Sequence, residues 1–137
     1  VQRKNLVKKK VLGKWTLREV ITHLTAWNRA QTKAIDEILT GHKPQWWGLN
    51  ANKFNNRAVI KRKSRSLKMI TEEWHRSFEV LIARLNKLTD EDWITTLQSK
   101  KYFKHRVSIQ AMFAYRYEGK DHEGGHAKQI GVFLKTR

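Results

Sequence analysis

The sequence contains no cysteine, only one proline and seven glycines among its 137 residues. Without cysteine there is no disulfide, no thiolate nucleophile and no zinc site of the cysteine type, so a metal site must use histidine and carboxylate ligands. No apolar run approaches the roughly 20 residues of a membrane-spanning helix, and no signal-type apolar region follows the basic start. We therefore expect a soluble, cytoplasmic protein with no membrane partner.

Acidic residues are also scarce, because 12 Asp and Glu stand against 29 Lys and Arg, which gives a formal charge of +17. Such a charge favours polyanions and acidic surfaces as partners, but it does not specify a function. Hydrophobic residues make up 39% of the chain and include six tryptophans, enough to fill one core. We expect a single helical-bundle domain over residues 1–137, in which residues 1–14 form a basic lead-in.

The spacing of apolar residues is close to 3.6 almost everywhere, which predicts a mostly helical protein. Thr16 and Glu19 have the spacing of a capping box, so a helix is predicted from there to about Thr40. Gly41 is suited to end this helix in the left-handed conformation. An ordered loop is expected over residues 41–50, followed by a short helix over residues 51–61.

A long helix is predicted to begin after Ser66 and to run to Leu88. Its inward face is expected to carry apolar residues at steps of three and four, namely Leu67, Ile70, Trp74, Phe78, Leu81, Ile82, Leu85 and Leu88. Residues 89–92 can cap one short turn, and residues 93–104 are interpreted as a connection. A last helix is predicted from about Val107 or Ser108 towards Leu134, with a middle weakened by Gly119, Gly124 and Gly125.

Three long amphipathic helices predict an all-α, up-and-down bundle. Helices of this length pack best in fours, and residues 1–14 are too short to supply the first one. We expect either that a first helix precedes Val1 in the natural protein, or that a second copy of the chain fills the open groove. A homodimer is the prediction that follows.

Two of the six histidines, His122 and His126, lie four residues apart in the last predicted helix, so their rings share one face. His23 borders the inward face of the first long helix. Together these three would offer three nitrogen ligands and leave an open position for water or substrate. The alternative is that each is an ordinary surface or core histidine. His42, His75 and His105 are not candidate metal ligands, because their positions are typical of solvated residues.

These residues also carry a resemblance. The segment GKWTLREVITHLTAW, residues 13–27, resembles the second-helix signature of the DinB-like four-helix-bundle superfamily, W-(S/T)-x-(K/R)-(E/D)-(V/I)-(L/I)-x-H-L followed by an aromatic residue. The segment HEGGHAKQI, residues 122–130, resembles its last-helix element, H-x-x-x-H-x-x-Q-I. Phe54-Asn55, and the long helix that opens at Ser66-Leu67 and ends at residues 88–92, are similar to the branch that contains the ClbS and DfsB proteins. The likeness covers about residues 12–134.

The resemblance implies a DinB-type bundle that lacks or truncates the first helix, with His23, His122 and His126 as its metal-binding triad. Members of the superfamily bind nickel, zinc or iron, and they include hydrolases and thiol-dependent transferases. We expect a divalent transition metal and a small electrophilic substrate, with a low-molecular-weight thiol as cosubstrate. Trp27 and Asn28 are candidates for the pocket wall. The candidates for orienting a histidine ring are Asn28, Asp121 and Glu123.

Two other hypotheses stay open. One is a metal-independent protein like ClbS and DfsB, which act as hydrolases on a reactive genotoxin. The other is a noncatalytic module that binds nucleic acid or a partner protein through basic clusters. These clusters are Lys8 to Lys10, Lys61-Arg62-Lys63 with Arg65, and Lys100, Lys101, Lys104 and Arg106 around Tyr102 and Phe103. The same clusters are equally typical of solvated helix ends.

Overall fold

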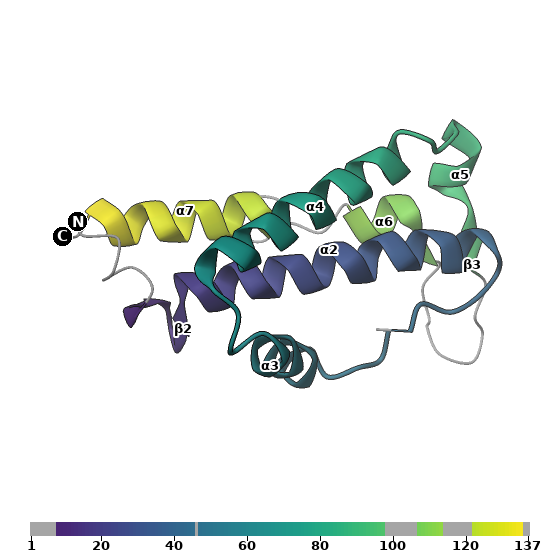
Figure 1. The fold of residues 1–137 in the computed structure, drawn as a ribbon. Coiled ribbons are helices and arrows are strands. Elements are labelled where there is room, and N and C mark those ends of the chain that lie inside the picture. The colour runs from purple at the N-terminus through teal and green to yellow at the C-terminus, as the bar shows by residue number, and fades with distance from the viewer. Residues whose placement is uncertain (1–7, 46, 98–106, 114–121, 136–137) are drawn as a thin grey trace.

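The computed structural model describes residues 8–45, 47–97, 107–113 and 122–135, and only the backbone of residues 96, 97, 107, 122, 123, 133 and 134. The described chain is mostly helical, so the all-α prediction is confirmed. Figure 1 shows long helices that lie along one another, with α3 set across them. The helices are α2 (Leu17–Leu39), α3 (Ala51–Lys61), α4 (Leu67–Leu85), α5 (Asp90–Ile94), α6 (Ile109–Phe113) and α7 (His122–Lys135).

Helix α2 is the central element, and α3, α4 and α7 all pack against it (Figure 1). Its start is the predicted capping box: the Thr16 hydroxyl accepts from the Glu19 N–H at 3.4 Å, and the Glu19 carboxylate accepts from the Thr16 N–H at 2.7 Å. Its end is a Schellman motif, in which Gly41, at φ 78°, donates to the Ile38 carbonyl and His42 donates to the Glu37 carbonyl. Both predicted boundaries are thus confirmed within one residue.

Helix α4 begins at the predicted cap, since Ser66 accepts from the Met69 N–H. Helix α3 has the predicted bounds, and Asn50 caps it by accepting from the Lys53 N–H. The predicted end of α4 at Leu88 is wrong by three residues, because the helix ends at Leu85. The chain continues in tighter turns there, and Leu88 donates its N–H to the Leu85 carbonyl. Leu88 still packs against the core, so its apolar character is used outside the regular helix.

Two small antiparallel sheets were not expected from the sequence. The strands of the first, β1 (Lys10–Leu12) and β2 (Trp15–Thr16), lie in and just after the predicted lead-in. Gly13, at φ 53°, permits the tight turn between them, which places Trp15 directly before α2. The second sheet pairs β3 (Thr96–Leu97) with β4 (Val107–Ser108). The segment predicted as the last helix contains α6 and α7. Residues 114–121 between them, including Gly119, lie outside the described residues.

The apolar core lies at the C-terminal half of α2, where α4 and α6 meet it. Its buried members are Ile35, Ile38, Leu81 and Ile109. Phe78 and Ile82, which were expected to face inward, are 37% and 38% exposed. The reason is that α4 buries Ile70, Glu73, Ser77 and Leu81, a face set by its packing on α2, and the other two residues lie outside it.

Within the described parts of the chain, no helix is both long enough and apolar enough to cross a membrane. The cytoplasmic location stays a prediction. Exposed apolar side chains such as Phe78 and Ile82 are available to a second copy, but no partner chain is present, and the homodimer also stays a prediction. The same holds for the idea that a first helix precedes Val1.

Candidate functional site: a buried histidine pair

Two of the three predicted ligand histidines meet at the N-terminal half of α2. His23 comes from α2 and His126 from α7, and each is only 6% exposed. Their ring centroids lie 5.1 Å apart, with the ring planes nearly perpendicular at 86°. Figure 1 shows α7 alongside this half of α2. His122 is the first residue of α7, and its side chain lies outside the described residues.

A hydrogen-bond chain fixes the tautomer of His23. The Trp27 Nε1–H can only donate, and it donates to Asn55 Oδ1 at 2.9 Å, which sets the orientation of the Asn55 amide. The same oxygen lies 3.0 Å from His23 Nδ1. An amide oxygen can only accept, so His23 must carry its proton on Nδ1. With the proton on Nδ1, an uncharged His23 ring has its lone pair on Nε2, the nitrogen through which such a ring would bind a metal.

His126 is held in the same way by its own helix. Gln129, one turn further along α7, accepts from His126 Nδ1 through Oε1 at 2.8 Å. Burial lowers the pKa of the His126 imidazole, and the hydrogen bond to Gln129 opposes that effect only in part. The ring is thus kept neutral near pH 7, with its lone pair also on Nε2. Neutral imidazoles with an anchored Nδ1–H are the usual form of histidine ligands to metals.

Aromatic rings enclose His23. The Trp15 ring from β2 lies 4.8 Å from it, and the Trp27 ring from α2 lies 6.4 Å from it in an edge arrangement. Trp27 packs in turn on Phe54 of α3 at 4.7 Å. Asn28, the other pocket candidate, is 3% exposed and donates to Ser77 of α4 at 3.4 Å. Its described contact therefore joins α2 to α4.

The other sequence candidates lie apart from this pair or outside the described residues. His42 and His75 are exposed, and the ring of His75 lies 4.6 Å from the Trp74 ring, tilted by 56°. His105 and Asp121 lie outside the described residues, as does the side chain of Glu123. The described ring-orienting residues are instead Asn55 and Gln129.

The residues present fit a metal ion in two respects. In both rings the donor nitrogen would be Nε2, and two imidazoles on one tetrahedral zinc ion have centroids about 5.2 Å apart, close to the observed 5.1 Å. Among the side chains that the structure describes, no group of three or more His, Cys, Asp or Glu gathers in a metal-binding arrangement. The predicted triad depends on His122, and it stays a prediction.

The comparisons with known proteins agree with the fold. The model of the DinB superfamily matches residues 4–130 of the 137. The chain belongs to the DinB superfamily. Neither the comparison with curated proteins nor the one with solved structures found a match. Superfamily membership supports the resemblance seen in the sequence, and it leaves metal, reaction and substrate open.

Sequence reasoning missed two residues that hold the rings of the histidine pair, Asn55 and Gln129. Gln129 belongs to the HxxxHxxQI element, and its place three residues after His126 on one helix is a signal for a side-chain contact. Asn55 had no such signal, because its contact with His23 spans 32 positions and depends on how α3 packs against α2. Only the fold brings it there.

A second polar cluster lies where α2, α3 and α4 meet. The Glu73 carboxylate, 8% exposed, pairs with Arg62 Nε at 2.8 Å, with Arg29 Nη2 at 3.6 Å and with Arg65 Nη1. Arg62 is itself 6% exposed, so it is not the solvated phosphate contact that the basic-cluster hypothesis requires.

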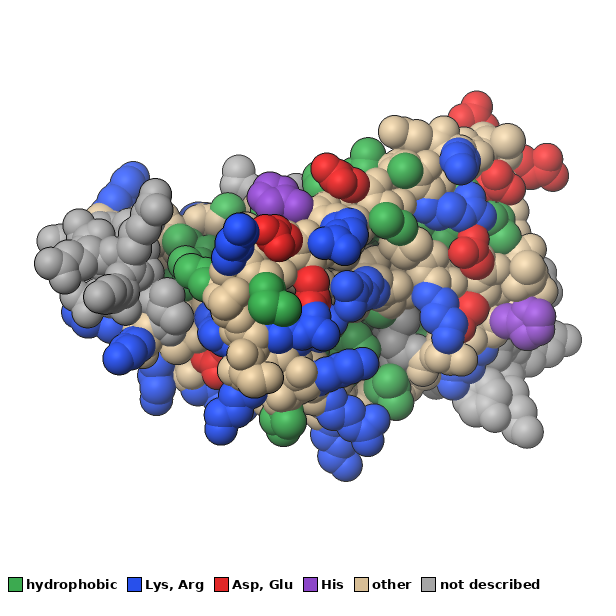
Figure 2. All heavy atoms as spheres, viewed as in Figure 1, with side chains coloured by type: hydrophobic (Ala, Val, Ile, Leu, Met, Phe, Trp, Pro, Cys, Tyr) green, Lys and Arg blue, Asp and Glu red, His purple; other side chains and the backbone are tan. Residues whose placement is uncertain are grey.

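Residues 100, 101, 104 and 106 of that hypothesis lie outside the described residues. Figure 2 shows many blue Lys and Arg side chains on the face over α3 and the middle of α2.

Proposed function

We propose that this DinB protein binds one divalent transition metal through His23, His126 and His122, and that it acts as a hydrolase or thiol-dependent transferase on a small electrophilic substrate. The observation that carries the proposal is the matched state of the two described rings. Each is buried, and each has its Nδ1 within hydrogen-bond distance of an amide oxygen, which makes Nε2 the nitrogen that would bind the metal. Burying two polar rings 5.1 Å apart costs free energy that apolar side chains at the same positions would not cost.

The chemistry of the site follows from these groups. A divalent ion held by these residues would lower the pKa of a bound water or thiol, and would so supply a nucleophile near neutral pH. Asn55 holds the His23 ring in place, and Trp15 and Trp27 shield it from bulk water. Exclusion of water strengthens the attraction between an electrophile and a nucleophile at this position.

The first test is metal content. Chain purified without an affinity tag, then dialysed against zinc or nickel, is expected to hold about one ion per molecule by elemental mass spectrometry. His23→Ala, His122→Ala and His126→Ala should each lose it. His75→Ala is the matched control, because His75 is exposed and lies apart from the pair. Retention of the ion in all four variants would overturn the proposed ligand set.

The second test concerns the reaction. The metal-loaded chain is expected to accelerate either the hydrolysis of an activated ester or the addition of glutathione to 1-chloro-2,4-dinitrobenzene, and His126→Ala is expected to abolish that rate. A rate that persists after metal removal and in His126→Ala would favour the metal-independent hydrolase hypothesis. No metal and no rate would favour a binding role.

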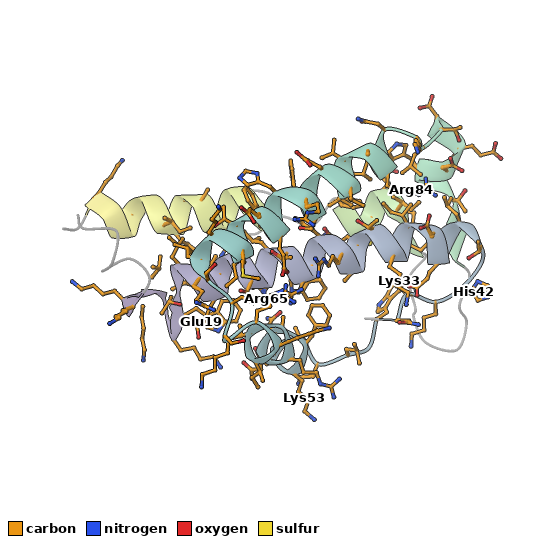
Figure 3. The ribbon with its side chains drawn as sticks, in the orientation of Figure 1. Glu19, Lys33, His42, Lys53, Arg65 and Arg84 are labelled. Atoms are coloured by element: carbon orange, nitrogen blue, oxygen red, sulfur yellow. The ribbon has the colours of Figure 1, made fainter. Side chains whose placement is uncertain are left out.

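The face over α3 favours nucleic-acid binding as a second candidate function. Lys53, Arg57, Lys61 and Lys63 are all exposed along or just after this helix. Figure 3 shows Lys53 pointing away from α2 into solvent. Binding of this kind weakens steeply with salt, and a function in recognition also needs a preference among sequences. Fluorescence anisotropy with labelled duplexes at two salt concentrations measures both.

A further inference from the structure

A pocket of about 310 Å³ lies on α2, away from the histidine pair. Its walls come from α2, from the segment between α2 and α3, and from Phe54 of α3. The apolar part of the lining consists of Ala26, Ala30, Leu49 and Phe54. Neither histidine nor Asn55 is part of the lining, so the pocket is distinct from the proposed metal site. Two alanines and an aromatic ring in the lining are compatible with a flat apolar group.

The polar part of the lining is unevenly charged. Lys33 lies 2.6 Å from Gln45 Oε1 and 3.7 Å from Glu37, and the Glu37 carboxylate also accepts from the Gln45 N–H at 3.0 Å. These contacts balance Lys33 against Glu37. Figure 3 shows Lys33 extending from α2 towards the segment that precedes α3. The remaining charged group of the lining is Arg29, whose side chain is 53% exposed and therefore accessible.

Arg29 forms an ion pair with a carboxylate that two other arginines also contact. Glu73 pairs with Arg29 at 3.6 Å, but the same carboxylate also pairs with Arg62 and Arg65. Three guanidinium groups around one carboxylate leave about two positive charges without a balancing anion in this cluster. Burial lowers the pKa of Arg29, and repulsion from Arg62, Arg65 and Arg76 lowers it further, which agrees with a local excess of positive charge.

We propose that this pocket binds a small organic anion, with its carboxylate or phosphate on Arg29 and a flat apolar body between Phe54 and the two alanines of α2. The volume falls near the lower end of the range for small-molecule sites, which is about 300 to 1,000 Å³. An anion supplies the charge that Glu73 divides among three arginines. Arginine also suits the planar, two-oxygen geometry of carboxylate and phosphate.

The test uses the full chain and isothermal titration calorimetry with 1-naphthoate, and with the neutral 1-naphthalenemethanol as its isostere. The naphthoate is expected to bind at least about tenfold more tightly, which is about 1.4 kcal/mol. Arg29→Gln should remove that preference. Arg57→Gln is the matched control, since Arg57 is an exposed arginine of α3 outside the lining. Ala30→Leu fills the pocket without changing charge and should weaken both ligands.

Three results would overturn the proposal. Equal binding of the anion and its isostere would remove the role of charge. Equal losses in Arg29→Gln and Arg57→Gln would assign the binding to the basic face as a whole, as for a polyanion. Unchanged binding in Ala30→Leu would place the ligand elsewhere. Thermal melting of each variant separates a loss of binding from a loss of fold.

The pocket and the metal site can fail separately. His126→Gln removes one proposed metal ligand but no residue of the pocket lining, so it is expected to bind 1-naphthoate as the unsubstituted chain does. Arg29→Gln is expected to keep its metal. Loss of naphthoate binding in His126→Gln would contradict the pocket assignment, whatever the metal content of the protein.

Discussion

The two halves of α2 bury opposite kinds of side chain. The N-terminal half buries mostly polar residues, and the C-terminal half buries apolar ones that form the core with α4 and α6. Both halves belong to one continuous helix with the same period of apolar and polar positions. The buried residues of the first half include Thr22, His23, Thr25 and Asn28, and those of the second are Ala34, Ile35 and Ile38.

The difference shows that the two halves of the helix meet the cost of burial in different ways. A buried polar group costs free energy unless it has a hydrogen-bond partner, and partners of the first half come from several elements. Thr25 donates to the Ile21 carbonyl of its own helix, Asn28 to Ser77 of α4, and His23 to Asn55 of α3. The apolar half needs no such partners and offsets that cost by burial.

The largest expected effect breaks the apolar half. Ile35 is fully buried among Ile38, Leu81 and Ile109, so Ile35→Ala should lower the free energy of unfolding by about 2–5 kcal/mol in urea denaturation. Metal binding by the folded fraction should not change. The control is Val80→Ala, which alters an exposed residue of α4 and should stay within about 0.5 kcal/mol. Equal losses in both would show that no packed core surrounds Ile35.

The next effect tests the polar half. Asn55→Ala removes the acceptor shared by His23 and Trp27, so unfolding should become easier by about 1–3 kcal/mol. Metal affinity should fall by about 10–100-fold, because the His23 ring loses its orientation. Asn56→Ala is the matched control, since Asn56 is the exposed neighbour on the same helix. A metal affinity unaffected by Asn55→Ala would contradict the positioning role.

The smallest effect is a pH dependence. Burial lowers the pKa of His126 in the folded chain, so the unfolded chain binds the proton first as the pH falls below about 6.5. Stability from this group is present above that pH and decreases below it. For metal-free protein, the loss between about pH 7.5 and pH 5 should be smaller in His126→Gln than in the unsubstituted chain. Parallel urea midpoints in the two proteins would contradict this.

Local signals made the helices predictable. The capping box at Thr16, the glycine stop at Gly41 and the serine cap at Ser66 each depend on residues three or four positions apart, and each is present in the structure. The two small sheets escaped prediction, because strands of two or three residues have no measurable alternation and depend on pairing. The exposure of Phe78 was also not predictable, because the spacing of apolar residues does not say which face of α4 packs against α2.

The candidate site was predictable only where it follows a helix. The inward position of His23 came from its spacing to apolar neighbours, and the place of His126 came from the HxxxHxxQI element. Asn55 and the cluster around Glu73 depend on contacts between helices far apart in sequence. Glu73 did leave a signal, because it occupies an inward position of α4 between Ile70 and Ser77. A carboxylate at such a position indicates a buried ion pair.

The central claim is that Asn55 and Gln129 accept from Nδ1 of His23 and His126, so that the lone pair of each ring lies on Nε2. Long-range ¹H–¹⁵N correlation spectra of the ¹⁵N-labelled, metal-free chain report the tautomer of each ring directly. Both rings are predicted to carry the proton on Nδ1, and addition of zinc is predicted to shift both Nε2 resonances while Nδ1 stays protonated. A ring protonated on Nε2, or an Nε2 signal that zinc leaves unmoved, would contradict the claim.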